Sequence, residues 1–227
     1  MIHYHGTPIT PHRALYELAG RNFCVSHYRP DQVKRVHEQA QSVLLDNGAF
    51  SHFRRGEPKY DWADYYEWSD YWLQFPTTWA VIPDVIDAGS QAQDALLREW
   101  PHGERGAPVW HMNEPIERLL GLLDKWPRVC IGSTDEFWKV MSPAWFQRMD
   151  AIWNAIAQRH TRAPWVHMLR GMALSGGPYP FGSVDSTDIA QNHNRPQNTP
   201  LKMANRWDAM QCPRAWTQSV DQCDFTF

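Results

Sequence analysis

Short apolar runs alternate along the chain with longer segments of helical character, and this alternation most constrains the fold. Runs typical of buried strands occupy residues 2–5, 22–27, 42–46, 78–82, 107–111, 128–132, 164–169 and 181–185. Helical segments lie between them at 30–39, 60–73, 90–100, 114–125 and 143–160, several opened by Asp, Ser or Pro. Such alternation predicts a parallel sheet. Eight units predict an α/β fold, a compact (β/α)8 TIM-like barrel, with an open doubly wound sheet as the alternative.

The length and composition indicate one domain. A chain of 227 residues suits one substantial core, and because no composition shift marks a boundary, we expect residues 1–227 to form a single barrel domain. With a net charge of -3, any contact with nucleic acid must be a local basic patch. The four cysteines lack close metal-site spacing, which predicts free thiols in a reducing cytoplasm. No apolar run approaches the roughly 20 residues that span a bilayer, so we expect no membrane partner.

Three apolar runs end in an acid. Asp46 ends its run just before Asn47-Gly48, Asp84 follows the run at 78–82, and Asp185 ends the last run. Because the carboxyl ends of parallel strands in a barrel face one mouth, these acids are expected to meet there. A pair of carboxylates can carry out chemistry at a sugar, one attacking the anomeric carbon and the other handling the proton. Asp46 fits a turn cap equally well, and Asp185 fits a helix N-cap.

Histidines suggest a metal site as an alternative. The segment His3-Tyr4-His5 places two imidazoles on one face of the first strand. His111 and His167 end or nearly end later strands, and Asp185 ends the last. This set is similar to the ligands of metal-dependent amidohydrolase-type barrels, since imidazole is a common metal ligand. The interpretation leaves the other two strand-terminal acids without a role.

A third interpretation is a noncatalytic module that binds nucleic acid. The chain contains 13 tryptophans, whose rings can stack on bases as well as fill a core. Basic residues gather in two clusters, Arg54, Arg55 and Lys59, and Arg195, Lys202, Arg206 and Arg214. Such clusters can contact phosphate, and they are also typical of a solvated surface.

Four motifs follow one another in a characteristic order: Asp46-Asn47-Gly48-Ala49-Phe50, Pro83-Asp84, Cys130-Ile131-Gly132-Ser133 and Asp185. In this order they resemble the tRNA-guanine transglycosylase superfamily, and within it the short DpdA-type deazapurine DNA-modification transglycosylases. The first motif is similar to the family's Asp-Ser-Gly-Gly-Phe. The resemblance implies that the protein has a barrel fold and is an enzyme. The implied activity is that of a glycosyltransferase, specifically a pentosyltransferase, that exchanges bases in nucleic acid.

The resemblance also implies roles for individual residues. Asp185 corresponds to the nucleophile that forms a covalent glycosyl-enzyme, and Asp46 to the acid implicated in proton transfer. The residues expected to bind the base are Asp84, His111, Gly132, Ser133 and Phe50. His111 stands where the family has a glutamine, and the family's cysteine-rich zinc site is missing, so no metal or other cofactor is expected.

The substrates follow from the same resemblance. The implied reaction exchanges guanine in DNA for a free 7-deazaguanine base of the preQ0 type, in the cytoplasm of a bacterial host, with a phage genome as one source of such enzymes. Exchange in tRNA is the alternative, which the absence of a tRNA-docking region disfavours. The residues expected to contact nucleic acid are Arg54, Arg55, Arg195, Lys202 and Arg206.

Overall fold

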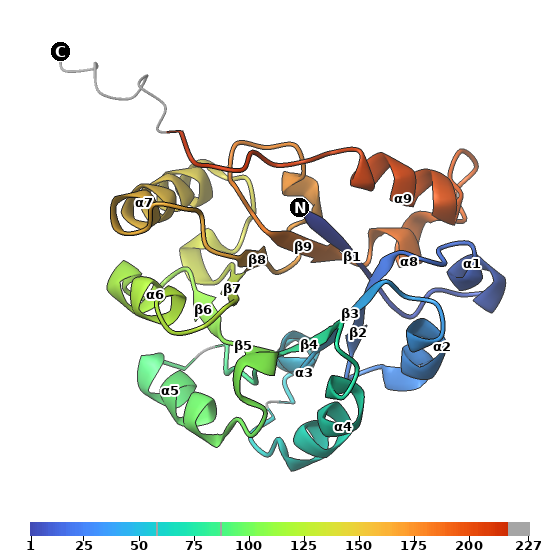
Figure 1. Cartoon of the computed structure of the whole chain (residues 1–227), viewed down its shortest axis with the longest axis horizontal. Coiled ribbons are helices and arrows are strands. Elements are labelled where there is room, and N and C mark those ends of the chain that lie inside the picture. Colours follow the sequence, from blue (N-terminus) through green and yellow to red (C-terminus); the bar gives the residue numbers. More distant parts are fainter. Residues whose placement is uncertain (58, 87, 218–227) are drawn as a thin grey trace.

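A single parallel sheet contains every strand in the described part of the chain, residues 1–57, 59–86 and 88–217 of the computed structural model (Figure 1). The strands are β1 (Ile2–Gly6), β2 (Asn22–Ser26), β3 (Ser42–Asp46), β4 (Thr78–Val81), β5 (Gly106–Ala107), β6 (Val109–His111), β7 (Val129–Gly132), β8 (Val166–Met168) and β9 (Ser183–Ser186). Their order in the sheet is β5-β4-β3-β2-β1-β9-β8-β7-β6. All eight pairings are parallel, so the carboxyl ends of the strands share one end of the sheet.

The two edges of this sheet belong to one extended segment. Only Pro108 separates β5 from β6. On one side the backbone N–H of Ile82 donates to the Ala107 carbonyl at 2.9 Å, and on the other the N–H of Cys130 donates to the Pro108 carbonyl at 2.8 Å. Proline has no N–H that could join the hydrogen-bond ladder of the sheet, so the strand is interrupted at Pro108. The carbonyl of Pro108 still accepts the hydrogen bond from Cys130. The sheet is therefore a nearly closed barrel.

The predicted strands agree with this architecture except at one point. Seven of the predicted runs each contain one strand, and the run at 107–111 contains parts of two, β5 and β6, because of Pro108. The described residues thus form nine strands where eight were predicted. The α/β, single-domain, barrel-like fold is confirmed at this coarser level. The fourth cysteine, Cys223, lies outside the described residues.

Helices surround the barrel (Figure 1). They are α1 (His12–Tyr16), α2 (Val33–His37), α3 (Ala49–Arg54), α4 (Ala63–Leu73), α5 (Ser90–Glu99), α6 (Ile116–Leu123), α7 (Pro143–Arg159), α8 (Asp188–Asn192) and α9 (Pro200–Asp208). Short 3-10 turns add η1 (Pro30–Gln32), η2 (Gly103–Arg105), η3 (Asp135–Phe137) and η4 (Met172–Leu174). The five predicted helices correspond to α2, α4, α5, α6 and α7. Within the described residues, none of the helices combines the length and the apolar character that crossing a membrane requires.

Apolar side chains fill two layers, one inside the barrel and one between the sheet and the helices. Along β3, Leu44 belongs to the interior cluster, whereas Val43 and Leu45 pack in the outer layer. Burial on both faces explains why such strands are continuous apolar runs and not alternating ones. In the interior, the indole N–H of Trp79 donates to the Tyr4 hydroxyl at 2.8 Å. This contact lies in the packed interior below the strand ends.

We predict that Gly106→Ala weakens the closure of the barrel. A Cβ at this position would lie 2.4 Å from Trp100 Nε1 and 2.6 Å from Ile82 Cγ1, so side chains or backbone must move. Overpacking of this kind costs about 1–3 kcal/mol. Urea unfolding should show a lower free energy of unfolding by that amount.

Gly121→Ala is the matched control. Gly121 lies within α6, and a Cβ there would meet no atom within 4 Å. Alanine is a better helix former than glycine by about 1 kcal/mol, so stability should be unchanged or slightly higher. Equal effects of the two substitutions would show that the space at Gly106 is not needed for closure.

Candidate active site

A cavity of about 420 Å³ opens at the carboxyl ends of the strands. This volume lies within the range of roughly 300–1,000 Å³ typical of small-molecule sites. Its lining includes all of the predicted catalytic and base-binding residues: Asp46, Phe50, Asp84, His111, Gly132, Ser133 and Asp185. The residues come from the ends of five different strands and the turns after them. The structure therefore brings together the whole set, although it leaves their roles as predictions.

The predicted nucleic-acid contacts divide into two groups. Arg54 and Arg55 lie at the end of α3, directly after the cavity-lining turn, and the guanidinium of Arg55 lies 5.0 Å from the ring of Tyr28, which lines the cavity. In the second group, Arg195 lies between α8 and α9, and Lys202 and Arg206 lie within α9; none of the three lines the cavity. Lys202 donates to the Gln197 carbonyl at 2.9 Å, and Arg206 lies 3.5 Å from Asp188. Only the first group is near the cavity.

Asp46 is fixed by the turn that follows β3. The backbone N–H of Gly48 donates to Asp46 Oδ2 at 3.1 Å, and the N–H of Ala49 donates to Asn47 Oδ1 at 2.8 Å. Gly48 has φ +81°, and a Cβ there would lie 3.0 Å from Tyr28 Cβ, so glycine suits this turn. The turn-cap interpretation and the site interpretation therefore hold together. One carboxylate both closes the turn and faces the cavity.

Burial and nearby acids raise the pKa of Asp46. Desolvation is the largest cause, and the negative charges of Asp185 and Asp84 add to it, giving a pKa of about 6. Hydrogen bonds from Ser26 and from the Gly48 N–H oppose the shift. A carboxyl group with this pKa can both give and take a proton near neutral pH.

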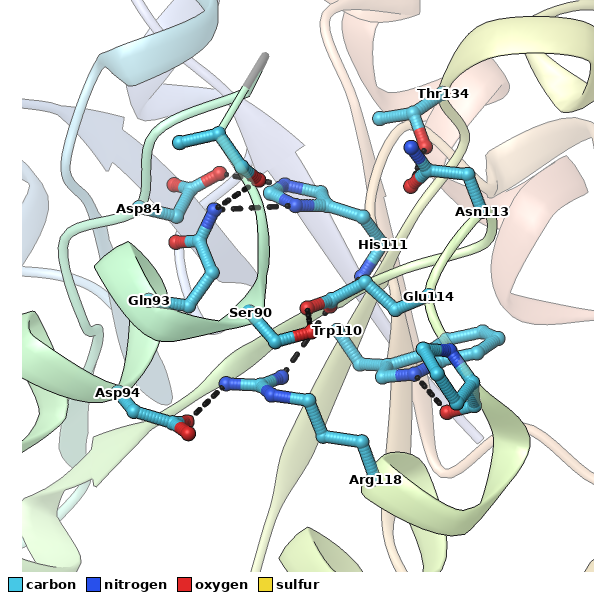
Figure 2. A network of polar contacts seen from close by, with 12 residues as sticks. Asp84, Ser90, Gln93, Asp94, Trp110, His111, Asn113, Glu114, Arg118 and Thr134 are labelled. Carbon is cyan, nitrogen blue, oxygen red and sulfur yellow. Dashed lines mark hydrogen bonds and ion pairs between the residues drawn. The ribbon is translucent and has the colours of Figure 1, made fainter.

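Asp84 is held from two sides at the end of β4. Asn47 Nδ2 donates to Asp84 Oδ1 at 2.9 Å and also to the Ile82 carbonyl at 2.9 Å. His111 Nε2 lies 2.9 Å from Asp84 Oδ2 (Figure 2). Asp84 is only 8% exposed, so its carboxylate is fixed at the edge of the cavity. Asn47 thus has two roles: its side-chain oxygen accepts a hydrogen bond within the turn, and its side-chain nitrogen orients the Asp84 carboxylate.

The pKa of His111 is raised despite burial. Desolvation lowers it, but the hydrogen bond and charge of Asp84, together with the charge of Glu114, outweigh that effect. The other ring nitrogen, Nδ1, lies 3.5 Å from the amide nitrogen of Gln93. The ring of His111 is therefore held between Asp84 and Gln93.

A network behind the cavity holds the backbone of His111, and sequence reasoning did not find it (Figure 2). The N–H of His111 donates to Glu114 Oε2 at 2.9 Å, and the Ser90 hydroxyl donates to Glu114 Oε1 at 2.8 Å. Arg118 lies 3.2 Å from Glu114 and 2.7 Å from Asp94. The spacing of four residues from Glu114 to Arg118 at the start of a predicted helix was the available signal.

Asp185 has one oxygen held and one without a hydrogen bond in the described part of the chain. The backbone N–H of Arg170 donates to Oδ1 at 2.7 Å, and His167 Nε2 lies 3.3 Å from the same oxygen. His167 is fully buried, and the indole N–H of Trp165 donates to the Ser183 hydroxyl at 2.9 Å. That hydroxyl also lies 2.8 Å from His167 Nδ1, so the ring of His167 is held beside Asp185. These contacts orient the carboxylate so that Oδ2 is available.

Two further predicted base contacts are constrained by their neighbours. A Cβ at Gly132 would lie 3.1 Å from His111 Cδ2, so the close approach of these strands favours glycine. The Ser133 hydroxyl accepts from Trp145 Nε1 at 3.0 Å. Gly132 and Ser133 therefore offer mainly backbone groups to a ligand.

The alternative metal-ligand set of His3, His5, His111, His167 and Asp185 is not brought together by the fold. Tyr4 belongs to the barrel interior, so His3 and His5 face the outer layer. His3 contacts Ser175 at 3.0 Å and Asp208 at 3.4 Å, away from the cavity. In the described part of the chain, no three or more His, Cys, Asp or Glu side chains are grouped so as to hold a metal ion.

Comparison of the chain with protein-family models, with curated proteins and with solved structures finds no match. The class of the protein therefore rests on its fold and on the cavity.

We predict that Asp46→Asn changes the pH dependence of stability. The pKa of Asp46 is about 6 in the folded protein and about 3.9 in an unfolded chain, so ionisation opposes folding. Relative to the variant, the wild type should lose about 2 kcal/mol of stability as pH rises from 4 to 7. Urea unfolding at several pH values measures this difference. Glu67→Gln, at an exposed position of α4, is the control; a stability difference between Asp46→Asn and wild type that does not vary with pH would contradict the assignment.

Asp84→Asn should lower the pKa of His111 below its ordinary value. Without the charge of Asp84, desolvation dominates, and the buried imidazole favours its neutral form. An NMR titration of the imidazole resonance that His111→Gln removes measures the shift. Asp94→Asn changes an acid of the same network that pairs with Arg118 and leaves His111 untouched; a similar shift in both variants would show that the effect is not local.

Proposed function

We propose that this protein is a base transglycosylase of the tRNA-guanine transglycosylase superfamily, built on a (β/α)8 TIM-like barrel and acting on DNA. It exchanges guanine for a free 7-deazaguanine base of the preQ0 type. The observation that carries the proposal is that Asp46 and Asp185 line one cavity, where Asp46 has a pKa of about 6 and Asp185 Oδ2 has no hydrogen bond among the described residues.

Asp185 supplies the nucleophile. Its Oδ2 attacks C1′ of the target deoxyribose, a C–O bond forms as the bond from C1′ to the base nitrogen breaks, and the departing guanine takes the electron pair. The Arg170 N–H holds Oδ1 at 2.7 Å, so the attacking oxygen is oriented. The covalent intermediate keeps the strand intact until the incoming base attacks C1′ and releases Asp185.

Asp46 donates a proton in the first step and accepts one in the second. The departing guanine nitrogen gains one proton, and the incoming base loses one when its nitrogen becomes glycosidic. With a pKa of about 6, about a tenth of Asp46 is protonated at pH 7, so it can serve as donor and then as acceptor.

The base edge is read by other groups that line the cavity. The Asp84 carboxylate can accept hydrogen bonds from the N–H groups of a guanine-type base, and the backbone of Gly132 lies at the end of β7. His111 replaces the family's glutamine and acts mainly by holding Asp84, since its Nε2 lies 2.9 Å from Oδ2 of that acid. Phe50 supplies an apolar ring at the cavity wall.

The target nucleotide must leave a duplex before it reaches these groups. C1′ and the base edge are hidden in stacked DNA, so the substrate is either single-stranded or extruded. Arg54 and Arg55, at the end of the cavity-lining turn and helix, can contact the strand. We assign the protein to the cytoplasm of a bacterial host, with a phage genome as one source.

Denaturing electrophoresis tests the proposal. Wild-type protein mixed with guanine-containing DNA should form a linked band that a 7-deazaguanine base discharges. Asp185→Asn keeps an oxygen that can accept from Arg170 but lacks the nucleophile, so no band should form. Asp46→Asn should slow discharge by about 100-fold or more, because a proton-transfer group is lost.

Controls separate this reaction from related ones. Glu67→Gln should form and discharge the band at the wild-type rate. A parallel reaction with tRNA distinguishes the two nucleic acids: a band with tRNA alone would overturn the assignment to DNA. Absence of a linked band with both would exclude transglycosylation through Asp185.

A further inference from the structure

Arg170 connects the rim of the cavity to its floor. The residue follows β8, lines the cavity and has φ +58°, a backbone conformation that L-residues other than glycine rarely adopt. In this conformation its N–H donates to Asp185. Such strain persists where surrounding contacts enforce it and is concentrated at functional sites.

The guanidinium of Arg170 lies against two aromatic rings. Its Cζ is 4.2 Å from the centroid of Phe50 and 4.6 Å from that of Trp138, within the range of cation-π contacts. The two rings are 5.4 Å apart and tilted by 36°. Trp138 is 43% exposed, so this Arg170 cluster, formed by Arg170, Phe50 and Trp138, reaches from the cavity to the solvent.

Most donors of this guanidinium are free in the described part of the chain. An arginine side chain has five N–H donors, and one hydrogen bond of this guanidinium is present there, from Nη2 to the Ser133 carbonyl at 3.3 Å. No carboxylate lies within 4.0 Å of the guanidinium among the described residues. Arg170 therefore presents a positive charge without an ion-pair partner at the cavity.

Acidic and basic side chains line different parts of the cavity. Asp46, Asp84 and Asp185 stand at the strand ends, whereas Arg29 and Arg170 line the cavity from the loops after β2 and β8. Arg54 is close enough for its charge to act on Arg170. A ligand that fits this pattern has an anionic group for the cations and hydrogen-bond donors for the acids, which is the polarity of a guanine nucleotide.

We propose that the Arg170 cluster is a phosphate subsite that selects a nucleotide over a nucleoside or free base, with the exposed ring of Trp138 beside it as a stacking surface for a neighbouring base. This inference rests on the proposed function and extends it, since it names the group of the DNA strand that the rim holds. Arginine is suited to this role because its planar fork binds two phosphate oxygens at once.

Binding of deoxyguanosine and of its 5′- and 3′-monophosphates, measured by calorimetry, tests the subsite. Wild-type protein should bind one of the monophosphates at least about ten-fold more tightly than the nucleoside, the effect of a hydrogen bond to a charged group. Arg170→Gln should remove this preference by weakening monophosphate binding more than nucleoside binding, because the backbone N–H to Asp185 is retained. Arg170→Lys should keep part of it, because charge remains without the fork.

The control is Arg162→Gln, which removes an exposed arginine remote from the cavity lining. It should keep the full preference for the monophosphate. Equal affinity of wild-type protein for nucleoside and monophosphates, or binding of neither, overturns the inference whatever the variants do. An equal loss of both ligands in Arg170→Gln would also overturn it, since that result indicates a purely structural role.

These outcomes are separable from failure of the proposed function. Arg170-dependent selection of the monophosphate without any linked band would leave the subsite standing and remove transglycosylation. A linked band with no selection for phosphate would support transglycosylation and overturn the phosphate subsite.

Discussion

The parallel ladder that closes on itself through residues 106–111 is the constraint on which the site depends. Because every strand runs in the same direction, each acid at a strand end faces the same mouth. Closure also determines neighbours: His111 pairs in register with Gly132 on one side, and the chain on the other side carries Asp84 to within 2.9 Å of the His111 ring. An open sheet would leave β4 and β7 apart, and His111 could not lie beside both Asp84 and Gly132.

Within that frame the three acids are held by different partners, and this difference gives the cavity its chemistry. Asp185 accepts from a backbone N–H and lies beside a buried imidazole. Asp84 is fixed by Asn47 and His111. Asp46 bonds the turn that follows it, and its pKa of about 6 reflects burial beside the other two acids. The negative charges gathered in one cavity thus add to burial in raising the pKa of Asp46.

Single residues connect the loops around the cavity to the strand ends inside it. The backbone N–H of Arg170 donates to Asp185, and its side chain covers Phe50, so a ligand that contacts the guanidinium would lie close to both residues. The Glu114 network has a similar role behind His111, since it binds the backbone of the residue whose ring holds Asp84. The acids that line the cavity are thus each held by hydrogen bonds or close contacts with neighbouring residues.

Local sequence determined much of this arrangement. The alternation of apolar runs and helical segments predicted the parallel barrel-like fold, and the acids at strand ends predicted the cavity lining, because a strand end and its turn are local features. The Asn47-Gly48 turn was equally readable, since its hydrogen bonds join residues two apart. Pro108 divided a predicted strand because a missing N–H changes pairing more than it changes hydrophobicity.

Tertiary structure decided what depends on distant partners. The alternation at His3, Tyr4 and His5 defines two faces of a strand, but both faces of this barrel are buried, so only packing reveals that the tyrosine points inward. The separation of Arg195 from the cavity, and the meeting of Arg170 with Phe50 and Trp138, likewise arise from loops far apart in sequence. The pattern of apolar residues in the sequence indicates which residues of one strand or helix share a buried face. Contacts between strands, helices and loops depend instead on how the whole barrel closes.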